Sequence, residues 1–197
     1  MHFPFGEEII LENDVVRLAP VNGSNVDTLL NVASLDRNLL QFSPKPIYNK
    51  ALLQGYIDGL LSGRKNQTRY AFSVFDKRQN AFAGCTGFLN ISQPDDRLEI
   101  GGTWYGKPFQ RTGLNRNCKY LLLTYAFDRL GAVRVAFRTD ERNQQSRQAI
   151  EKIGGQYEGL LRQHMRMHDV YRRNTVCYSI LKSEWAALQP TFLAPPA

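Results

Sequence analysis

The amino-acid sequence predicts a single α/β domain with a mixed β-sheet and helices on both of its faces. Segments with strand spacing and helix spacing follow one another in the order β-α-α-β-β-β-α-β-α-β-β. The length of 197 residues is a little over one domain, at about 150 residues per domain. Hydrophobic residues make up 43% and charged residues 22%, which is ordinary for a globular protein and excludes a collagen-like repeat or a disulfide scaffold.

The first half of the chain supplies one strand, two helices and three further strands. Alternation of apolar and polar residues predicts the first strand, and apolar residues three and four apart predict the two helices. Pro44 and Pro46 make the segment between these helices a loop. The expected elements are a strand over 14–19, helices over 25–33 and 49–61, a loop over 36–48, and strands over 70–75, 83–91 and 98–105, with a turn at 93–96.

The second half supplies two helices, one strand and a closing hairpin. Gly131 and Gly154 each follow a helical segment at the place where a C-terminal cap glycine is preferred. The expected elements are helices over 113–130 and 143–153, a strand over 133–139, and hairpin strands over 158–166 and 172–181. We expect the domain to end at residue 185 and the proline-containing tail over 186–197 to be loosely held.

The cysteines, the N-terminus and the apolar runs predict a cytoplasmic protein. Cys85, Cys118 and Cys177 are odd in number and scattered in apolar segments, which favours reduced core thiols over disulfides or metal ligands. The N-terminus lacks the basic start of a signal peptide. No apolar run approaches the roughly 18 residues of a membrane span.

The charge of the chain indicates an anionic ligand. Lys and Arg number 25 against 18 Asp and Glu, a balance of +7. Part of this excess is local, because the segment over 107–119 holds four basic residues and no acid. Such a segment suits either a nucleic acid or a phosphorylated cofactor.

A candidate phosphate site lies where the strand over 98–105 is followed by a loop and a helix. A helix N-terminus carries unpaired N–H groups and a partial positive charge, so a tight loop before it can hold phosphate oxygens. The sequence Gln110-Arg111-Thr112-Gly113-Leu114-Asn115 fits this geometry. It matches neither the Walker pattern nor the dinucleotide fingerprint. The alternative is that Thr112 or Asn115 merely caps the helix and Gly113 turns the chain.

Together with motifs on both sides of it, this loop resembles the GNAT family of acyl-CoA-dependent N-acyltransferases, and within it the RimJ/RimL branch of ribosomal-protein N-terminal acetyltransferases. The family's phosphate loop reads Q/R-x-x-G-x-G/A, and residues 110–114 match it. The resemblance covers most of the chain from the first strand to Trp185. It continues through residues 119–123, 126–127, Thr139, Asn143, Ser146, Arg147, 149–154, Glu158, Gly159, Arg162 and 178–181.

The resemblance implies that coenzyme A binds between two splayed strands, which end at Tyr105 and Thr139. Its pyrophosphate would lie on the amides of Arg111 to Asn115. A strand bulge near Trp104 and Tyr105 would free backbone groups that bind the pantetheine and polarise the thioester carbonyl. Asn143 matches the family's asparagine on the cofactor arm, and Ser146 follows one helical turn later. One departure is Asn115, which stands where the family has Gly or Ala.

Two residues are candidates for acid and base catalysis. The tyrosine that protonates the leaving thiolate in many members of the family is replaced here by Ile150. Ser146 or solvent would then supply that proton, or Ser146 only orients the cofactor. Glu99 is the candidate base for the amine, because a half-buried strand carboxylate can take up a proton. By strand alternation Glu99, Gly101 and Thr103 share one face. A solvated carboxylate is the plain alternative.

The acceptor pocket is expected to include Phe42 from the loop over 36–48, together with Arg162, His164 and Arg166. His164 and His168 are four residues apart, but they flank a predicted hairpin without a third ligand, so no metal site is expected.

The sequence therefore predicts an enzyme that transfers an acyl group, most simply acetyl, from acetyl-CoA to an amine. The expected acceptor is the α-amine of a peptide or a small amino compound, and homodimers are common in this branch. Two other classes stay open: a CoA-binding regulator without turnover, and a basic nucleic-acid module. The basic loop lacks interleaved aromatic residues, which disfavours specific binding of nucleic acid, and no membrane partner is expected.

Overall fold

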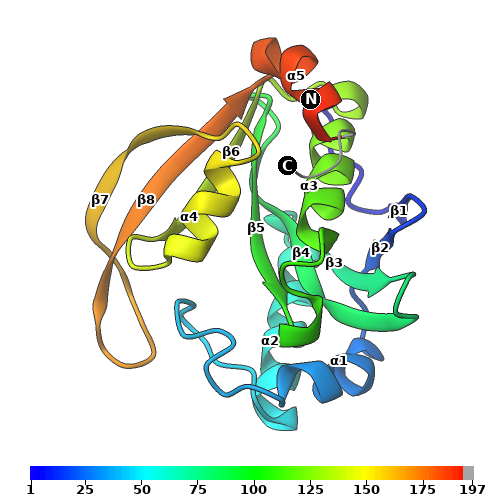
Figure 1. The fold of residues 1–197 in the computed structure, drawn as a ribbon, viewed down its shortest axis with the longest axis vertical. Helices are drawn as coiled ribbons and strands as arrows, with labels where there is room; N and C mark the ends of the chain where they lie inside the picture. The colour runs from blue at the N-terminus through cyan, green and yellow to red at the C-terminus, as the bar shows by residue number, and fades with distance from the viewer. Residues whose placement is uncertain (193–197) are drawn as a thin grey trace.

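A computed structural model describes residues 1–192. One eight-stranded sheet runs through the whole domain, and helices lie on both of its faces (Figure 1). Its elements are β1 (Leu11–Glu12), β2 (Val16–Pro20), α1 (Asn25–Ala33), α2 (Lys50–Lys65), β3 (Arg69–Asp76), β4 (Ala81–Ser92), β5 (Arg97–Tyr105), η1 (Lys107–Phe109), α3 (Leu114–Thr124), η2 (Tyr125–Arg129), β6 (Arg134–Asp140), α4 (Gln144–Glu151), β7 (Gln156–Arg166), β8 (Arg172–Leu181), α5 (Lys182–Leu188) and η3 (Gln189–Phe192).

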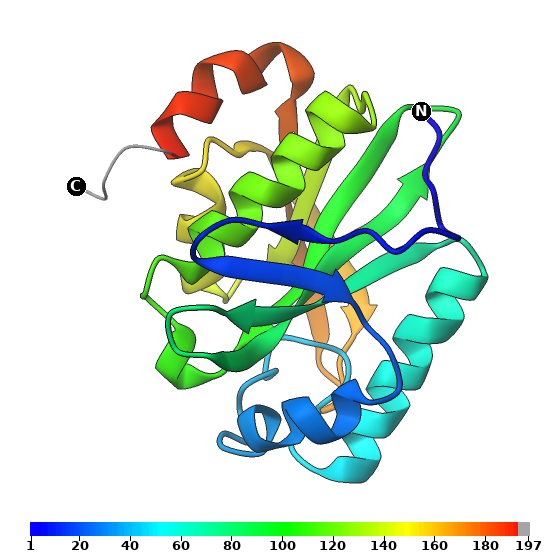
Figure 2. The ribbon, with the colours of Figure 1, turned by 90° about the vertical axis from the view of Figure 1, so that its right-hand side faces the viewer.

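The strand order is β1-β2-β3-β4-β5-β6-β8-β7, with β1 and β7 at the two edges (Figures 1 and 2). Only β5 and β6 pair in parallel, and every other neighbouring pair is antiparallel. The parallel pair needs a crossover connection, and α3 supplies it. The predicted mixed α/β domain is therefore confirmed.

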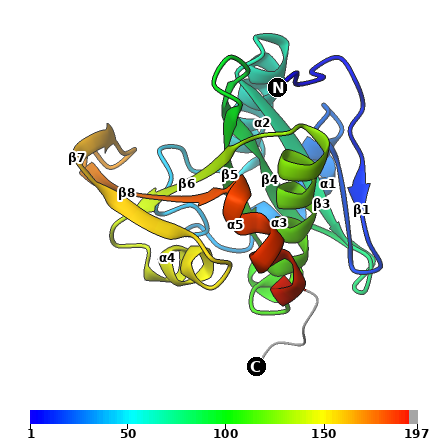
Figure 3. The same cartoon turned by 90° about the horizontal axis from the view of Figure 1, so that it is seen from above.

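Two hydrophobic clusters fill the space between the sheet and its helices. The larger one joins the sheet to α3, α4 and α5, and it includes Leu122, Phe127, Ile150 and Trp185. The smaller one joins the other face to α1 and α2. Figure 3 shows the two helix layers on opposite sides of the sheet. We call these the α3 face and the α2 face.

The pairing between β5 and β6 is short. It covers only Arg97, Leu98 and Glu99 of β5, opposite Arg134, Val135 and Ala136 of β6. Beyond Glu99 the two strands diverge, and Figure 1 shows the β6-β8-β7 part of the sheet turning away from the β2–β5 part. The splay expected between the strands ending at Tyr105 and Thr139 is present.

The helix expected over residues 113–130 is interrupted near its end. It is α-helical from Leu114 to Thr124 and continues as a π-helical turn over Tyr125–Arg129. Gly131 follows with a φ of 72°, which is the left-handed conformation expected of a C-terminal glycine.

The C-terminal boundary differs from the sequence prediction. Residue 185 falls inside α5, where the Trp185 side chain is buried and its indole N–H donates to Asp128 at 3.1 Å. Phe192 packs on Trp185 and Tyr120. The segment 186–192 is thus anchored at its end by Phe192, a contact that proline counting does not reveal. The last part of the expected tail, 193–197, lies outside the described residues.

All three cysteines are free, and Cys85 and Cys118 are buried while Cys177 is partly exposed. Among the described residues, no helix has both the length and the apolar character needed to cross a membrane.

The packing of α5 leads to a stability prediction. Trp185→Ala should lower the free energy of unfolding by about 3–5 kcal/mol, because it removes a buried aromatic side chain and leaves a cavity. Leu181→Ala is the matched control, since Leu181 is 39% exposed at the same end of the domain, and it should change stability by less than about 0.5 kcal/mol. Urea unfolding measures both variants, and equal losses would show that α5 is not part of the core.

Candidate functional site

The loop before α3 has the backbone geometry of an anion site. Arg111 and Gly113 adopt left-handed conformations, with φ angles of 60° and 83°. Gly113 is the N-cap residue of α3, and the Thr112 hydroxyl oxygen accepts the Leu114 N–H at 3.4 Å. The N–H groups of Arg111, Thr112 and Gly113 donate to no backbone acceptor within residues 1–192. Successive free amides of this kind form a concave anion-binding surface. We call residues 110–115 the phosphate loop.

Side chains of the phosphate loop and of the β3–β4 turn hold it in place. Gln110 donates from Nε2 to the Tyr105 carbonyl at 2.8 Å, which ties the loop to the end of β5. Thr112 donates from its hydroxyl to the Phe109 carbonyl at 2.9 Å. From the β3–β4 turn, Arg78 donates to the Thr112 carbonyl at 3.2 Å and also contacts the buried Asp76 carboxylate. Arg78 was not predicted as part of this loop, because its contact with Thr112 spans 34 residues.

The phosphate loop can accommodate a phosphate group. A Cβ built on Gly113 would meet no atom within 4 Å, so the space above this residue is open. Leu114 is fully buried and contributes packing. Asn115, the departure from the family pattern, turns away from the loop and accepts a hydrogen bond from the Tyr105 hydroxyl at 3.2 Å. Its side chain therefore reaches towards β5 rather than over the free amides.

A bulge in β5 lies earlier than the sequence predicted. The β4–β5 register runs from Cys85 opposite Trp104 to Gly87 opposite Gly101, so β5 carries one extra residue between Gly101 and Trp104. Gly102 has a φ of 61°, which glycine adopts without strain. The expectation near Trp104 and Tyr105 is corrected to Gly102 and Thr103. Trp104 instead packs in the α2-face cluster, where its indole donates to the Tyr56 hydroxyl at 3.3 Å.

The bulge also reverses the face on which Thr103 lies. Glu99 and Gly101 are on the α2 face, but Thr103 bonds to Lys119 of α3 and is on the opposite face. The predicted alignment of Glu99, Gly101 and Thr103 is therefore wrong at Thr103. A strand alternates with a period of two only while no residue is inserted.

Glu99 sits at the point where β5 and β6 separate. The residue is 8% exposed, and its Oε2 accepts from Asn90 Nδ2 at 2.8 Å and lies 3.6 Å from Arg138 Nε. Its Oε1 accepts no hydrogen bond within residues 1–192, and it would lie 3.4 Å from a Cβ built on Gly101. One carboxylate oxygen is thus fixed, while the other faces the glycine segment of β5.

The N-terminus of α4 follows the end of β6, the second strand of the splay. Asn143 caps this helix, with its Oδ1 accepting the Ser146 N–H at 3.0 Å, so its Nδ2 stays available as a donor. The Ser146 hydroxyl makes no hydrogen bond within the described residues. Ile150, one turn later, is buried in the core and carries no proton donor. Ser146, one turn before Ile150, therefore has a hydroxyl that could donate a proton, whereas Ile150 has none.

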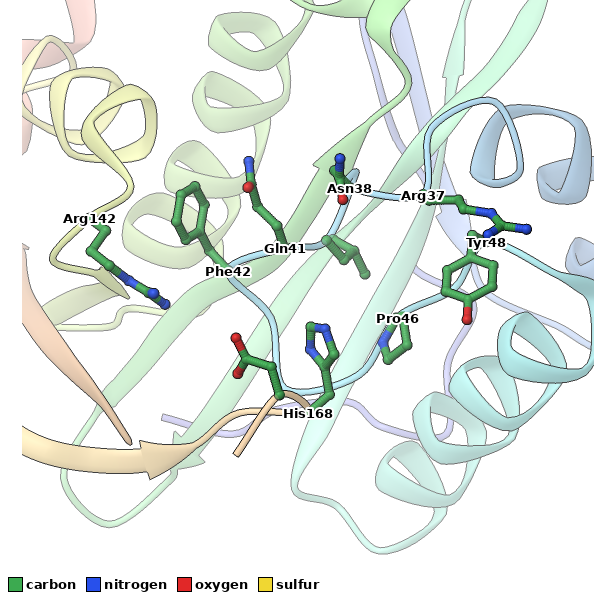
Figure 4. Close-up of a pocket in the computed structure, with 10 residues that line it drawn as sticks. Arg37, Asn38, Gln41, Phe42, Pro46, Tyr48, Arg142 and His168 are labelled. Atoms are coloured by element: carbon green, nitrogen blue, oxygen red, sulfur yellow. The ribbon is translucent and has the colours of Figure 1, made fainter. Parts of the chain in front are cut away.

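A cavity of about 420 Å³ opens on the α2 face beside the α1–α2 loop (Figure 4). Three segments meet there: the α1–α2 loop with Phe42, the start of the β6–α4 connection with Arg142, and the β7–β8 turn with His168. The Arg142 guanidinium lies 5.6 Å from the Phe42 ring centre and 3.8 Å from that of Tyr171. The cavity is lined by Arg37, Asn38, Leu40, Gln41, Phe42, Pro46, Tyr48, Arg142, His168 and Asp169.

The buried Arg173 links this cavity to the region of Glu99. It donates to the Phe42 carbonyl at 3.2 Å and to the Thr175 hydroxyl at 3.0 Å. Burial lowers the pKa of Arg173, and the charges of Asp140 and Glu99 act in the opposite direction. His164 joins the same group, with its Nδ1 3.1 Å from the Thr175 hydroxyl oxygen.

The remaining acceptor candidates are less well placed. Arg162 and Arg166 are exposed on β7, and Arg162 makes no hydrogen bond or ion pair within residues 1–192. His164 and His168 bond to different partners, Thr175 and the Ser43 carbonyl. In the described part of the chain no group of three or more His, Cys, Asp or Glu residues could hold a metal ion.

Comparison with known proteins identifies related chains. The family model described as Acetyltransferase (GNAT) domain matches residues 16–156. A crystal structure of a GCN5-related N-acetyltransferase from Brucella melitensis superimposes with a TM-score of 0.88 at 30% identity, covering 96% of this chain and 87% of that one. A Bacillus subtilis (strain 168) protein named "Putative ribosomal N-acetyltransferase YdaF" is 33% identical over 105 residues. That match covers 53% of this chain and 56% of the relative.

A third comparison concerns the fold alone. The structure titled "RimL- Ribosomal L7/L12 alpha-N-protein acetyltransferase" has a TM-score of 0.78 at 19% identity, with 88% of this chain and 94% of that chain covered.

The cavity rim depends on Asp140, whose side chain is buried and accepts from the Arg142 N–H, Nε and Nη2 at 2.8–3.0 Å. Burial acts to raise the pKa of Asp140, but the bonds from Arg142 outweigh it and lower the pKa. Asp140→Asn should lower the free energy of unfolding at pH 7 by about 1.5–3 kcal/mol.

Because the folded pKa of Asp140 is lowered, its stabilisation is complete above the unfolded pKa of about 3.9 and is lost as the pH falls further. The stability difference between wild type and Asp140→Asn should therefore shrink below about pH 4. Urea unfolding across this range tests the prediction, with the exposed Glu8→Gln as control. A difference that stays constant to pH 2 would rule out a lowered pKa for Asp140.

Proposed function

The chain belongs to the GNAT acetyltransferase family, and on this premise we propose that it transfers the acetyl group of acetyl-CoA to the α-amine of a peptide or small amino compound. The observation that carries the proposal is the splay between β5 and β6. The phosphate loop lies at the end of β5, one of the two splayed strands. Glu99 and the cavity lie on the α2 face of the sheet.

The donor site is built from backbone. The phosphate loop offers amides to the pyrophosphate, and the unpaired edge of β5 from Ile100 to Tyr105 offers strand hydrogen bonds to an extended arm. Asn143 Oδ1 is taken by the Ser146 N–H, so its Nδ2 would be the donor to that arm. The side chains of Gln110, Thr112 and Leu114 shape the loop, and its backbone amides are the groups that would contact the ligand. Trp104 and Tyr105 contribute through their backbone, since their side chains are buried and bonded elsewhere.

The reaction needs one proton removed and one supplied. The amine nitrogen attacks the acetyl carbonyl carbon, a C–N bond forms, the C–S bond breaks, and its electron pair leaves with the sulfur of coenzyme A. Glu99 Oε1, directly or through a water, takes the proton of the amine. Ser146 or solvent returns a proton to the sulfur. Alignment of donor and acceptor in the splay supplies much of the rate.

An α-amine suits a single carboxylate base. Its pKa is near 8, against about 10.4 for a lysine side chain, so more of it is neutral at physiological pH. The acceptor would enter through the cavity between the α1–α2 loop and the β7–β8 turn. The name of the related Bacillus subtilis protein, "Putative ribosomal N-acetyltransferase YdaF", supports N-acetylation as the reaction.

The donor site is tested by the melting temperature. Acetyl-CoA should raise the melting temperature of the wild type, because a ligand at about 100 times its Kd adds roughly 2.7 kcal/mol. Gly113→Glu should abolish this rise, since it places a bulky negative charge in the phosphate loop. Gly131→Glu is the matched control, because Gly131 also has a positive φ and open space beside it. It should keep the rise, and an unchanged rise in Gly113→Glu would remove the phosphate site.

The base and the acceptor are tested by turnover. Glu99→Gln should lower kcat by roughly 10²–10⁴-fold with little change in acetyl-CoA affinity. A control is Glu158→Gln, a carboxylate that pairs with Arg134 and Ser179 away from the splay. Free-amine peptides should be acetylated faster than N-terminally blocked lysine peptides. Faster acetylation of the blocked lysine peptides would refute the α-amine as acceptor. Full activity in Glu99→Gln would refute Glu99 as the base. Binding of acetyl-CoA without turnover on any amine would indicate a CoA-binding regulator.

A further inference from the structure

Lys119 is a buried cation without a counter-charge. The residue is 6% exposed in the middle of α3, and its Nζ donates to the Thr103 hydroxyl at 2.8 Å. No carboxylate lies within ion-pair distance of it among residues 1–192. An isolated ammonium in an apolar core is costly unless something compensates for its charge. The mechanism above makes no use of this residue.

The position of Lys119 coincides with the β5 bulge. Its only bonded partner in the described structure, Thr103, is the residue that follows Gly102 in the inserted segment. Thr103 in turn bonds to Thr86 of β4 at 2.8 Å. The ammonium is therefore fixed through Thr103 to the part of β5 whose free edge faces the splay. It also belongs to α3, the helix whose N-terminus follows the phosphate loop.

We propose that the buried ammonium of Lys119 is the positive charge that stabilises the thiolate of coenzyme A as it leaves at the bulge. This inference rests on the proposed function. When the C–S bond breaks, the negative charge on sulfur needs a partner, and a fixed charge in a water-poor site stabilises it strongly. Lys119 acts through Thr103 and through space, so it is a positioning and electrostatic residue rather than one that touches the substrate.

The surroundings leave Lys119 free for this role. Burial lowers its pKa to about 8, so it is charged at neutral pH and loses its charge above pH 8. The titratable group that acts on it is the Cys118 thiol of α3, which in turn contacts the Tyr105 phenol of β5. Burial raises the pKa of both, so both are neutral in this range. Asp76 of β3 lies beyond Cys118 and is paired with Arg78.

A purely structural role predicts a different behaviour. If Lys119 only tied α3 to the sheet, its removal would weaken the fold and leave the sulfur chemistry unchanged. If instead the charge serves the thiolate, burying the ammonium lowers the free energy of unfolding, and a neutral side chain removes that cost. The neutral, similarly shaped Lys119→Met should then melt no lower than wild type at pH 7.

The experiment measures the pKa of the coenzyme A thiol in the protein–CoA complex, from the ultraviolet absorbance of the thiolate. We expect this pKa to be lower in the wild-type complex than in free CoA. Lys119→Met and Lys119→Gln should raise it by about one unit or more, because both remove the charge, while Lys119→Arg should keep it low. Lys119→Gln is included because it retains a hydrogen-bond donor for Thr103.

Turnover gives a second readout. Lys119→Met should lower kcat by roughly 10²-fold. The wild-type rate should fall above pH 8, where Lys119 loses its charge, and this fall should be absent in Lys119→Met. An unchanged thiol pKa in Lys119→Met, or a wild-type value in Lys119→Gln, would overturn the proposal. The thiol titration needs no acceptor, so its result does not depend on the acceptor assignment. If CoA does not bind at all, the rise in melting temperature will be missing, which distinguishes failure of the proposed function from failure of this inference.

Discussion

The short parallel pairing of β5 with β6 is the constraint on which the rest of the structure depends. Three residues on each strand hold the two parts of the sheet together, and past Glu99 the strands have no common hydrogen bonds. Unpaired backbone inside a domain needs partners. The fold leaves such backbone along the inner edge of β5 and places the phosphate loop at the end of that edge. This edge is suited to a ligand that forms strand-like hydrogen bonds.

The extra residue at Gly102 divides the site between the two faces of the sheet. Before it, Glu99 points to the α2 face and meets Asn90 and Arg138. After it, Thr103 points to the α3 face and meets Lys119. A regular strand would have put both on one face. Because of the bulge, the proposed base and the proposed counter-charge of the thiolate act from opposite sides of the same splay.

Charged groups that the fold buries gather near this splay. Asp140 at the end of β6 is compensated by Arg142, and Arg173 is held by Phe42 and Thr175. These two groups have partners and shape the wall of the cavity. Lys119 has one hydrogen-bond partner in the described structure, the Thr103 hydroxyl, so its burial costs stability that the fold does not recover within the described residues. Asp140 and Arg173 thus have compensating partners in the fold, whereas the charge of Lys119 is uncompensated, and we assign it a role in the reaction.

The sequence by itself determined the order of the elements from β2 to β8, the mixed sheet, and the candidacy of the loop over 110–115 and of Glu99, because each rests on local periodicity or on a short motif. It did not indicate β1 or α5. The tertiary structure decided what long-range contacts control. Gly102 rather than Trp104 carries the bulge, and Arg78 braces the phosphate loop from the β3–β4 turn. It also decided that Lys119 is buried without a carboxylate, although in the sequence it counts as one more charge in a basic segment. The physical reason is that the burial of a side chain and the register of a strand depend on contacts between residues far apart in the sequence. The residue type and its neighbours in the chain do not determine these contacts.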